Sequence, residues 1–285
     1  MSELRDEIRA DLAKRCLEML DAGTVPWRKP WQGEGGLPVN VQTGKRYQGM
    51  NSILLLWAGH TYWAGYGQWK KLGGQVQKGE HGTEIWRPAR WATVKDAAGK
   101  ERRIPTRFTL CKVFNSGQQV GWNAPAVKVN DVQPNHAAEM IVDAMPNRPT
   151  IDNVLGDRAC YYPLLDKITM PKPEQFESAE SYYSVLFHEL SHSTGHASRC
   201  NRDGMGDMTK HAYSREELVA EFGSLFLCAE CNIAMAVIAN SASYIRTWRD
   251  RIANAPEILD DVINDAQRAA NYVLTPKAIE VTEVA

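Results

Sequence analysis

Positive charge and tryptophan are concentrated in the first 128 residues of the chain, and negative charge in the rest. Residues 1–128 contain 20 lysines and arginines against 11 aspartates and glutamates, whereas residues 129–285 contain 13 against 23. Eight of the nine tryptophans lie in the basic part. Because a single hydrophobic core rarely grows beyond about 250–300 residues, we expect the 285 residues to form two domains with separate tasks, at 1–128 and 129–285.

The composition and the N-terminal sequence exclude other classes of protein. With 44% hydrophobic and 24% charged residues, the chain is neither disordered nor collagen-like. The charge-free stretch at 49–68 is interrupted by polar residues and four glycines, so it is too polar to span a membrane. The first 20 residues carry acidic side chains, unlike a signal peptide, and six scattered cysteines are typical of a reducing compartment. We expect a cytoplasmic protein with no membrane partner.

In the basic half, the spacing of apolar residues predicts helices and a sheet. Apolar residues recur at helical spacing from Leu4 to Leu20, which predicts an opening helix, and a second helix is expected at Met50–Ala58. β-rich runs at 83–94 and 107–114 are separated by turn residues, so they predict a small antiparallel sheet.

The acidic half begins after a linker and is mostly helical. Residues 123–134 contain two prolines and few core residues, which is typical of a linker. A helix at His136–Met145 and short strands at 159–162 and 167–170 are followed by mainly helical sequence to Leu274. The expected fold class is α+β, with a small mixed α/β domain followed by a mostly helical domain that contains a short antiparallel sheet.

Basic residues in the first half alternate with aromatic ones, most densely at 27–31. Cations attract phosphates, and aromatic rings stack on bases at about 1–3 kcal/mol each, so the pattern indicates a site for single-stranded nucleic acid, with double-stranded DNA as a second candidate partner. Any one tryptophan could equally be a core residue, and any one lysine a solvated side chain. The predicted contacts are Trp27, Arg28, Lys29, Trp31, Lys45, Arg46, Tyr47, Asn51, Trp69, Lys70 and Lys78, with Lys71, Arg87, Arg90, Arg102, Arg103 and Arg107 as further basic positions.

The acidic half contains an HExxH sequence, His188-Glu189-Leu190-Ser191-His192. On a helix the i, i+4 spacing places both imidazoles on one face, where they can share a metal ion. Glu189 is adjacent and could act as a general base without being a ligand. Zinc is the expected metal, with another divalent ion as the alternative. A metzincin would require a further histidine at 198, which is Ser198, and no aspartate cluster suggests a two-metal nuclease.

A third protein ligand is expected from the downstream helix at 214–227. Glu217 and Glu221 lie on one face of it, and the residues alone leave open which of the two binds the metal, while Glu216 is expected to point elsewhere. Candidate donors to a developing oxyanion, each equally compatible with ordinary packing, are Tyr161, Tyr162, His211 and Tyr213. Cys228 and Cys231 are expected to be core thiols, because no second cysteine pair accompanies them.

Four sequence blocks follow one another in the basic half: VPWRKPW, PVNVQTGKRYQGMNSILLL, GGQVQKGEHGTEIW and FTLCKVFNSGQQ. They resemble the N-terminal single-stranded-DNA-binding domain of ArdC-type antirestriction proteins, over most of residues 1–125. The acidic half, including HELSHSTGH and EELVAEFGSLFLCAE, resembles the zincin-like domain of the same proteins. The resemblance implies a protein of a plasmid or other mobile element that shields DNA arriving by conjugation from host restriction.

The resemblance also implies roles for individual residues. The Glu217–Glu221 spacing is similar to the glutamate-helix pattern of gluzin-type metallopeptidases, which implies that Glu217 is the ligand and that Glu221 orients a ligand histidine. The segment at 159–171 resembles the zincin strand that pairs with a peptide substrate. A host restriction-system protein is the expected target. The alternative is a DNA-binding protector whose metal site is structural or inert.

Overall fold

The computed structural model describes residues 2–22, 36–95, 101–124, 134–203, 210–233, 249–250, 252–254, 256 and 258–275. Contacts divide the chain into an N-terminal unit, Met1–Glu7 with Leu37–Lys128, and a C-terminal unit, Ile8–Gly36 with Val129–Ala285. The division expected from sequence differs in that it places residues 8–36 with the basic half. Among the described residues, every helix is too short or too polar to cross a membrane.

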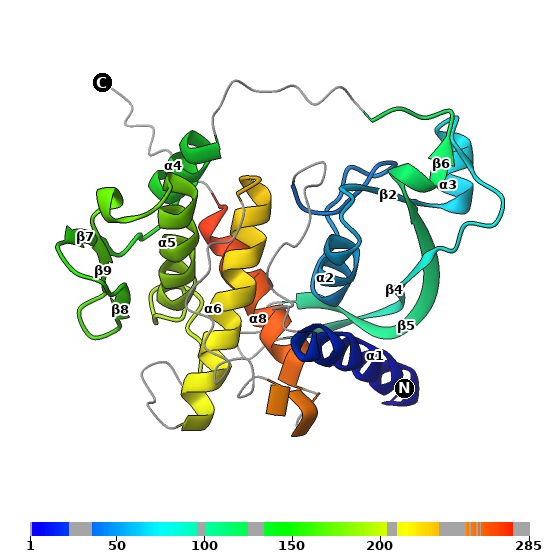
Figure 1. The fold of residues 1–285 in the computed structure, drawn as a ribbon. Helices are drawn as coiled ribbons and strands as arrows, with labels where there is room; N and C mark the ends of the chain where they lie inside the picture. The colour runs from blue at the N-terminus through cyan, green and yellow to red at the C-terminus, as the bar shows by residue number, and fades with distance from the viewer. Residues whose placement is uncertain are drawn as a thin grey trace, which may run out of the picture. The chain divides into compact units, whose positions relative to one another are not determined.

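The N-terminal unit contains a four-stranded sheet dominated by one long curved hairpin, β4 with β5 (Figure 1). The strand order is β1-β2-β5-β4, with bounds Val39–Asn40, Tyr62–Gly65, Glu101–Asn115 and Thr83–Lys95. The predicted antiparallel pairing of β4 and β5 is confirmed, whereas β1 pairs with β2 in parallel. A two-stranded sheet joins β3 to β6, and the helices are α2 and α3, with bounds Gln75–Val76, Gln119–Val120, Met50–Trp57 and Tyr66–Lys71.

Two apolar clusters hold this unit together. One contains Ile85, Val113 and the buried Trp63, packed against α2. The other contains Trp69, whose ring is fully buried and whose indole N–H donates to the Phe114 carbonyl at 3.0 Å. The expectation that Trp69 offers an exposed stacking surface is therefore wrong. An alternation of cations and rings cannot tell which rings fill the core, and here the core takes this one.

The C-terminal unit is built mainly from helices. Where the structure describes this unit, the helical predictions are confirmed, whereas residues 204–209 and 234–248 lie outside the described residues. The bounds are α1 Ser2–Asp21, of which residues 8–21 belong to this unit, α4 Pro134–Ala144, α5 Ala179–Ser193, α6 Lys210–Glu230 and α8 Ile258–Val273. Ser178 caps α5, since its hydroxyl accepts from the Ser181 amide at 3.1 Å. Cys228 and Cys231 are buried free thiols, as predicted.

A three-stranded sheet, in the order β7-β9-β8, accompanies these helices. Its strands are β7 Thr150–Val154, β8 Cys160–Tyr162 and β9 Lys167–Pro171. An antiparallel sheet was expected, and this expectation is wrong, because the sheet is mixed. A short turn joins β8 to β9 and makes that pair antiparallel, whereas β7 lies on the other side of β9 and pairs in parallel.

Helices α5 and α6 approach closely at Gly223. A β-carbon at that position would lie 2.6 Å from the Ser191 hydroxyl, inside any normal contact distance. The Ser191 hydroxyl is itself committed to the helix, because it donates to the Phe187 carbonyl at 2.7 Å. The missing side chain therefore allows the helix that carries HExxH to pack directly on the helix that carries the glutamates.

Candidate metal centre

Three side chains from α5 and α6 converge on one point. The Nε2 atoms of His188 and His192 lie 3.1 Å apart, as the i, i+4 spacing predicts. The Glu217 carboxylate oxygens lie 3.7 Å from Nε2 of His188 and 3.5 Å from Nε2 of His192. One ligand atom from each of the three falls within 4.8 Å of the others.

This arrangement fits a tetrahedral divalent metal. Ligand atoms about 2.0–2.1 Å from zinc are separated by about 3.3 Å, close to the separations observed here. Burial alone would disfavour a charged imidazole, but the surrounding carboxylates, Glu217 foremost, outweigh it and raise the pKa of His188 to about 9. The pocket of negative charge therefore favours a cation. His188, His192 and Glu217 form a metal-binding His/His/Glu site, and the predicted donor types, two imidazoles and one carboxylate, are confirmed.

Glu189 is fixed beside this site by the sheet. Its Oε2 accepts a 2.7 Å hydrogen bond from the backbone N–H of Tyr161, which lies in β8. The carboxylate is buried, with 8% of the residue exposed. The residue that was predicted as a general base is thus held by an edge strand and not by the metal ligands.

Glu216 and Arg202 support His192, and no sequence pattern indicates either role. When Nε2 of His192 serves as a ligand, its ring proton is on Nδ1, which lies 3.4 Å from Oε1 of Glu216. Glu216 was expected to point elsewhere, but the nearly buried guanidinium of Arg202 pairs with it through two hydrogen bonds. The same guanidinium donates to the Ser191 carbonyl at 2.9 Å and so ties Glu216 to the end of α5.

Glu221 is buried, and its negative charge contributes to the raised pKa of His188. The Nδ1 atom of His188 is buried and has no hydrogen-bond partner among the described residues. Glu221 was predicted to orient a ligand histidine, but it makes no hydrogen bond to Nδ1 of His188. In contrast, Glu216 contacts Nδ1 of the other histidine directly.

The predicted oxyanion donors lie in different environments. The Tyr161 hydroxyl donates to Asp166 at 2.8 Å and accepts from the buried Arg199 at 3.1 Å. Burial, followed by the hydrogen bond to Asp166, raises the pKa of Tyr161. Tyr162 is 43% exposed. His211 and Tyr213 belong to α6, but their side chains lie outside the described residues.

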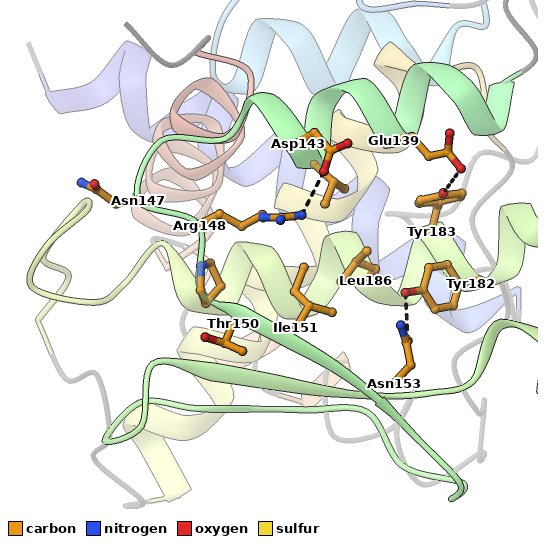
Figure 2. Close-up of a pocket in the computed structure, with 12 residues that line it drawn as sticks. Glu139, Asp143, Asn147, Arg148, Thr150, Ile151, Asn153, Tyr182, Tyr183 and Leu186 are labelled. Atoms are coloured by element: carbon orange, nitrogen blue, oxygen red, sulfur yellow. Dashed lines mark hydrogen bonds and ion pairs between the residues drawn. The ribbon is translucent and has the colours of Figure 1, made fainter. Parts of the chain in front are cut away.

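A cavity of about 810 Å³ lies between α4, β7 and α5 (Figure 2). Tyr182, Tyr183 and Leu186 line it, and the centre of these positions lies about 150° around α5 from that of His188 and His192, so the cavity faces away from the metal ligands. Its polar groups pair among themselves, since Tyr183 donates to Glu139, Tyr182 to Asn153 and Arg148 to Asp143. The cavity is therefore separate from the metal centre.

The predicted DNA contacts in the N-terminal unit are only partly on the surface. Lys45, Arg46, Lys70 and Lys78 are exposed. The partly buried Tyr47 hydroxyl accepts from the Asn40 amide at 3.0 Å. The Asn51 side chain binds both backbone groups of Trp86, which closes part of the β4 edge. Four further predicted contacts lie outside the described residues, namely Trp27, Arg28, Lys29 and Trp31.

The two metal-binding histidines on one helix, the glutamate on the next and the accompanying sheet define a protein of the zincin-like class. Residues 136–260 match the family of zincin-like metallopeptidases, and residues 6–114 match the N-terminal domain of the anti-restriction factor ArdC. The chain belongs to the ArdC family of antirestriction proteins. Both parts of the predicted family resemblance are thereby confirmed.

Solved structures extend this result over nearly the whole chain. The metal-free crystal structure of the antirestriction ArdC protein from plasmid R388 is 30% identical, with a TM-score of 0.70, and the match covers 93% of this chain and 96% of that one. The Mn(II)-bound structure of the same protein is 29% identical with the same TM-score and the same coverage.

Sequence relatives differ greatly in length. Two Escherichia coli proteins named DNA primase TraC are 36% and 34% identical over 95% and 99% of this chain. This chain spans only 20% and 28% of their lengths. The uncharacterized protein y4eC of Sinorhizobium fredii (strain NBRC 101917 / NGR234) is 30% identical over 94% of this chain and 91% of its own length.

Proposed function

We propose that this protein binds single-stranded DNA through its basic half, residues 1–128, and hydrolyses peptide bonds at its metal centre. By both means it protects DNA that enters with a mobile element from host restriction, with a protein of the restriction system as the target. The observation that carries the catalytic part is the position of Glu189, held by Tyr161 beside His188, His192 and Glu217.

The residues around the centre divide the chemistry among them. His188, His192 and Glu217 would hold zinc, and a bound metal would polarise the scissile carbonyl and activate water. Glu189 keeps Oε2 bonded to the Tyr161 amide, so Oε1 is the atom that takes the proton from water and delivers it to the departing amine. Strand β8 lies at the edge of its sheet, where an extended peptide could pair with it.

The choice of zinc rests on the donor set, because two imidazoles and one carboxylate are a common catalytic zinc environment. Manganese is the alternative, since the R388 ArdC structure was obtained with Mn(II) bound. Elemental analysis of protein purified without added metal, followed by competition between the two ions, distinguishes them.

Support for DNA binding comes from the charge of the basic half and from exposed cations such as Lys45, Arg46, Lys70 and Lys78. Family membership supports the link to antirestriction.

The decisive experiment transfers unmodified DNA into a restricting host that carries either the wild-type protein or the Glu189→Gln variant. Glutamine keeps an acceptor for the Tyr161 amide but cannot take up the proton, so metal and DNA binding should persist. Loss of protection would support a peptidase that acts on a host protein. Full protection by the variant would reject the catalytic part and favour a DNA-binding protector with an inert or structural metal.

A further inference from the structure

One face of the β4–β5 hairpin changes from apolar to basic along its length. Near α2 this face carries Ile85 and Val113, which are buried in the core. Farther along the two strands it carries Arg87, Arg90 and Arg107, all exposed. The hairpin therefore continues beyond the part of this face that α2 covers (Figure 1).

The strand register places the three arginines on one face. Arg90 and Arg107 are directly opposite in the ladder, so their side chains project to the same side. Thr109 follows Arg107 by two positions and shares its side, and Arg87 lies opposite Thr109. The same alternation connects these positions to Cys111, opposite Ile85 on the core face.

Two like charges opposite each other weaken a sheet unless an anion lies between them. In the part of the chain that the structure describes, none of the three arginines pairs with a carboxylate. The cation Lys112, by comparison, lies 3.7 Å from Glu84, its ladder partner. The face that carries Arg87, Arg90 and Arg107 therefore holds positive charge that no carboxylate among the described residues neutralises and that does not stabilise the hairpin.

The ladder is also irregular at this point. The register shifts between Pro88 and Arg90 and again between Arg90 and Trp91, and such bulges redirect side chains and frequently adjoin functional sites. Trp91 follows Arg90 directly and is 46% exposed, the largest exposure among the described tryptophans in the hairpin. An exposed ring beside guanidinium groups is the combination that binds unpaired nucleotides.

We propose that Arg87, Arg90 and Arg107 bind successive phosphates of single-stranded DNA, and that Trp91 stacks on a base beside them. This inference rests on the proposed DNA-binding function and locates it on one hairpin face. Guanidinium groups suit phosphate because they donate two parallel hydrogen bonds, and the adjacent ring favours a nucleic acid over an acidic peptide.

The test uses the full-length protein and a fluorescein-labelled oligothymidylate, titrated across a salt series. One variant carries Arg87→Gln, Arg90→Gln and Arg107→Gln. The control carries Lys95→Gln and Lys112→Gln, which removes two charges from exposed positions of the same hairpin that are not among the expected DNA contacts. Thermal melting of both variants verifies folding.

The arginine variant should bind at least about tenfold more weakly, and its log–log salt slope should fall by about 2, since each phosphate contact in a single strand contributes about 0.7. Its melting temperature should be unchanged or higher, because the Arg90–Arg107 repulsion is removed. Trp91→Leu should weaken binding with the salt slope unchanged. The lysine control should lose less than about threefold.

Other results overturn the inference in recognisable ways. If wild-type protein does not bind the oligonucleotide at low salt, the proposed DNA binding itself fails. If it binds and the arginine variant binds equally well, only the assignment to this face fails. Equal losses in the arginine and lysine variants mean general charge attraction without a site. Competition by polyglutamate as effective as by oligothymidylate would assign the face to an acidic protein partner.

Discussion

Glu189 and Tyr161 are joined by a 2.7 Å hydrogen bond from the Tyr161 backbone amide to the Glu189 carboxylate. The donor belongs to a strand and the acceptor to the helix of the metal ligands, so the bond fixes the sheet edge relative to the centre. Because a backbone amide makes it, no side-chain substitution at 161 removes the donor except proline.

The first prediction concerns Glu189. Glu189→Gln should retain one metal ion per chain but lower peptide hydrolysis by about 10²–10⁴-fold, the usual contribution of a general base. Mass spectrometry of a peptide library incubated with each protein measures the loss, and elemental analysis measures the metal. Hydrolysis at the wild-type rate by the variant would show that another group takes the proton.

The second prediction concerns the ligands. His188→Ala and His192→Ala should abolish metal binding, and Glu217→Ala should lower the metal content more than Glu221→Ala, because only Glu217 reaches both Nε2 atoms. Elemental analysis after dialysis against a weak chelator measures the metal content of all four variants. The reverse order for the two glutamates would exchange their roles.

The third prediction concerns Glu216. Glu216→Ala leaves the nearly buried guanidinium of Arg202 without its carboxylate, which should cost about 3–5 kcal/mol in the free energy of unfolding. Glu216→Gln keeps an oxygen that can accept hydrogen bonds, so it should fold better while binding metal about 10–100-fold more weakly. Urea unfolding and metal competition measure the two effects separately. A folded Glu216→Gln protein with wild-type metal affinity would remove Glu216 from the centre.

The fourth prediction concerns acid stability. Burial tends to raise the pKa of Asp166, but the hydrogen bonds from Arg199 and Tyr161 outweigh it and hold that pKa below its usual value. The folded protein thus binds fewer protons than the unfolded chain in acid. The stabilisation is complete above the unfolded pKa of about 3.9 and is lost as the pH falls through the lower folded value.

Asp166→Asn is the matched variant, since asparagine tolerates the left-handed backbone at this position, where φ is 46°. It should melt below the wild type at neutral pH, and the gap should narrow as the pH falls through this range. A gap that stays constant with pH would show that the charge of Asp166 is not what stabilises this turn.

The parts of the centre that the sequence predicted are those encoded locally. His188 and His192 share a helix face at any i, i+4 spacing, and the apolar pattern around Glu217 identified a second helix. Arg202 could not be found in this way, because it lies in the segment after α5 and reaches Glu216 only once α5 and α6 are packed. No periodicity relates those two positions.

The fold shows the same limit. The long strands of the hairpin were predicted from their composition, but two-residue strands such as β1 and β3 carry too little pattern to be distinguished from loops. Trp69 illustrates the limit for binding residues, since a ring next to lysines in the sequence can equally fill a core. The assignment of residues 8–22 to the C-terminal unit depends on tertiary contacts, which no local pattern predicts.

The geometry of the metal centre depends on the absence of a β-carbon at Gly223. Any larger residue there would meet the Ser191 hydroxyl and force α6 away from α5, with Glu217 carried along. A homologue could then retain every ligand of the His/His/Glu set and still fail to assemble the centre. When ArdC-family sequences are screened for metal-competent members, the size of the residue at this crossing is thus as informative as the HExxH motif itself.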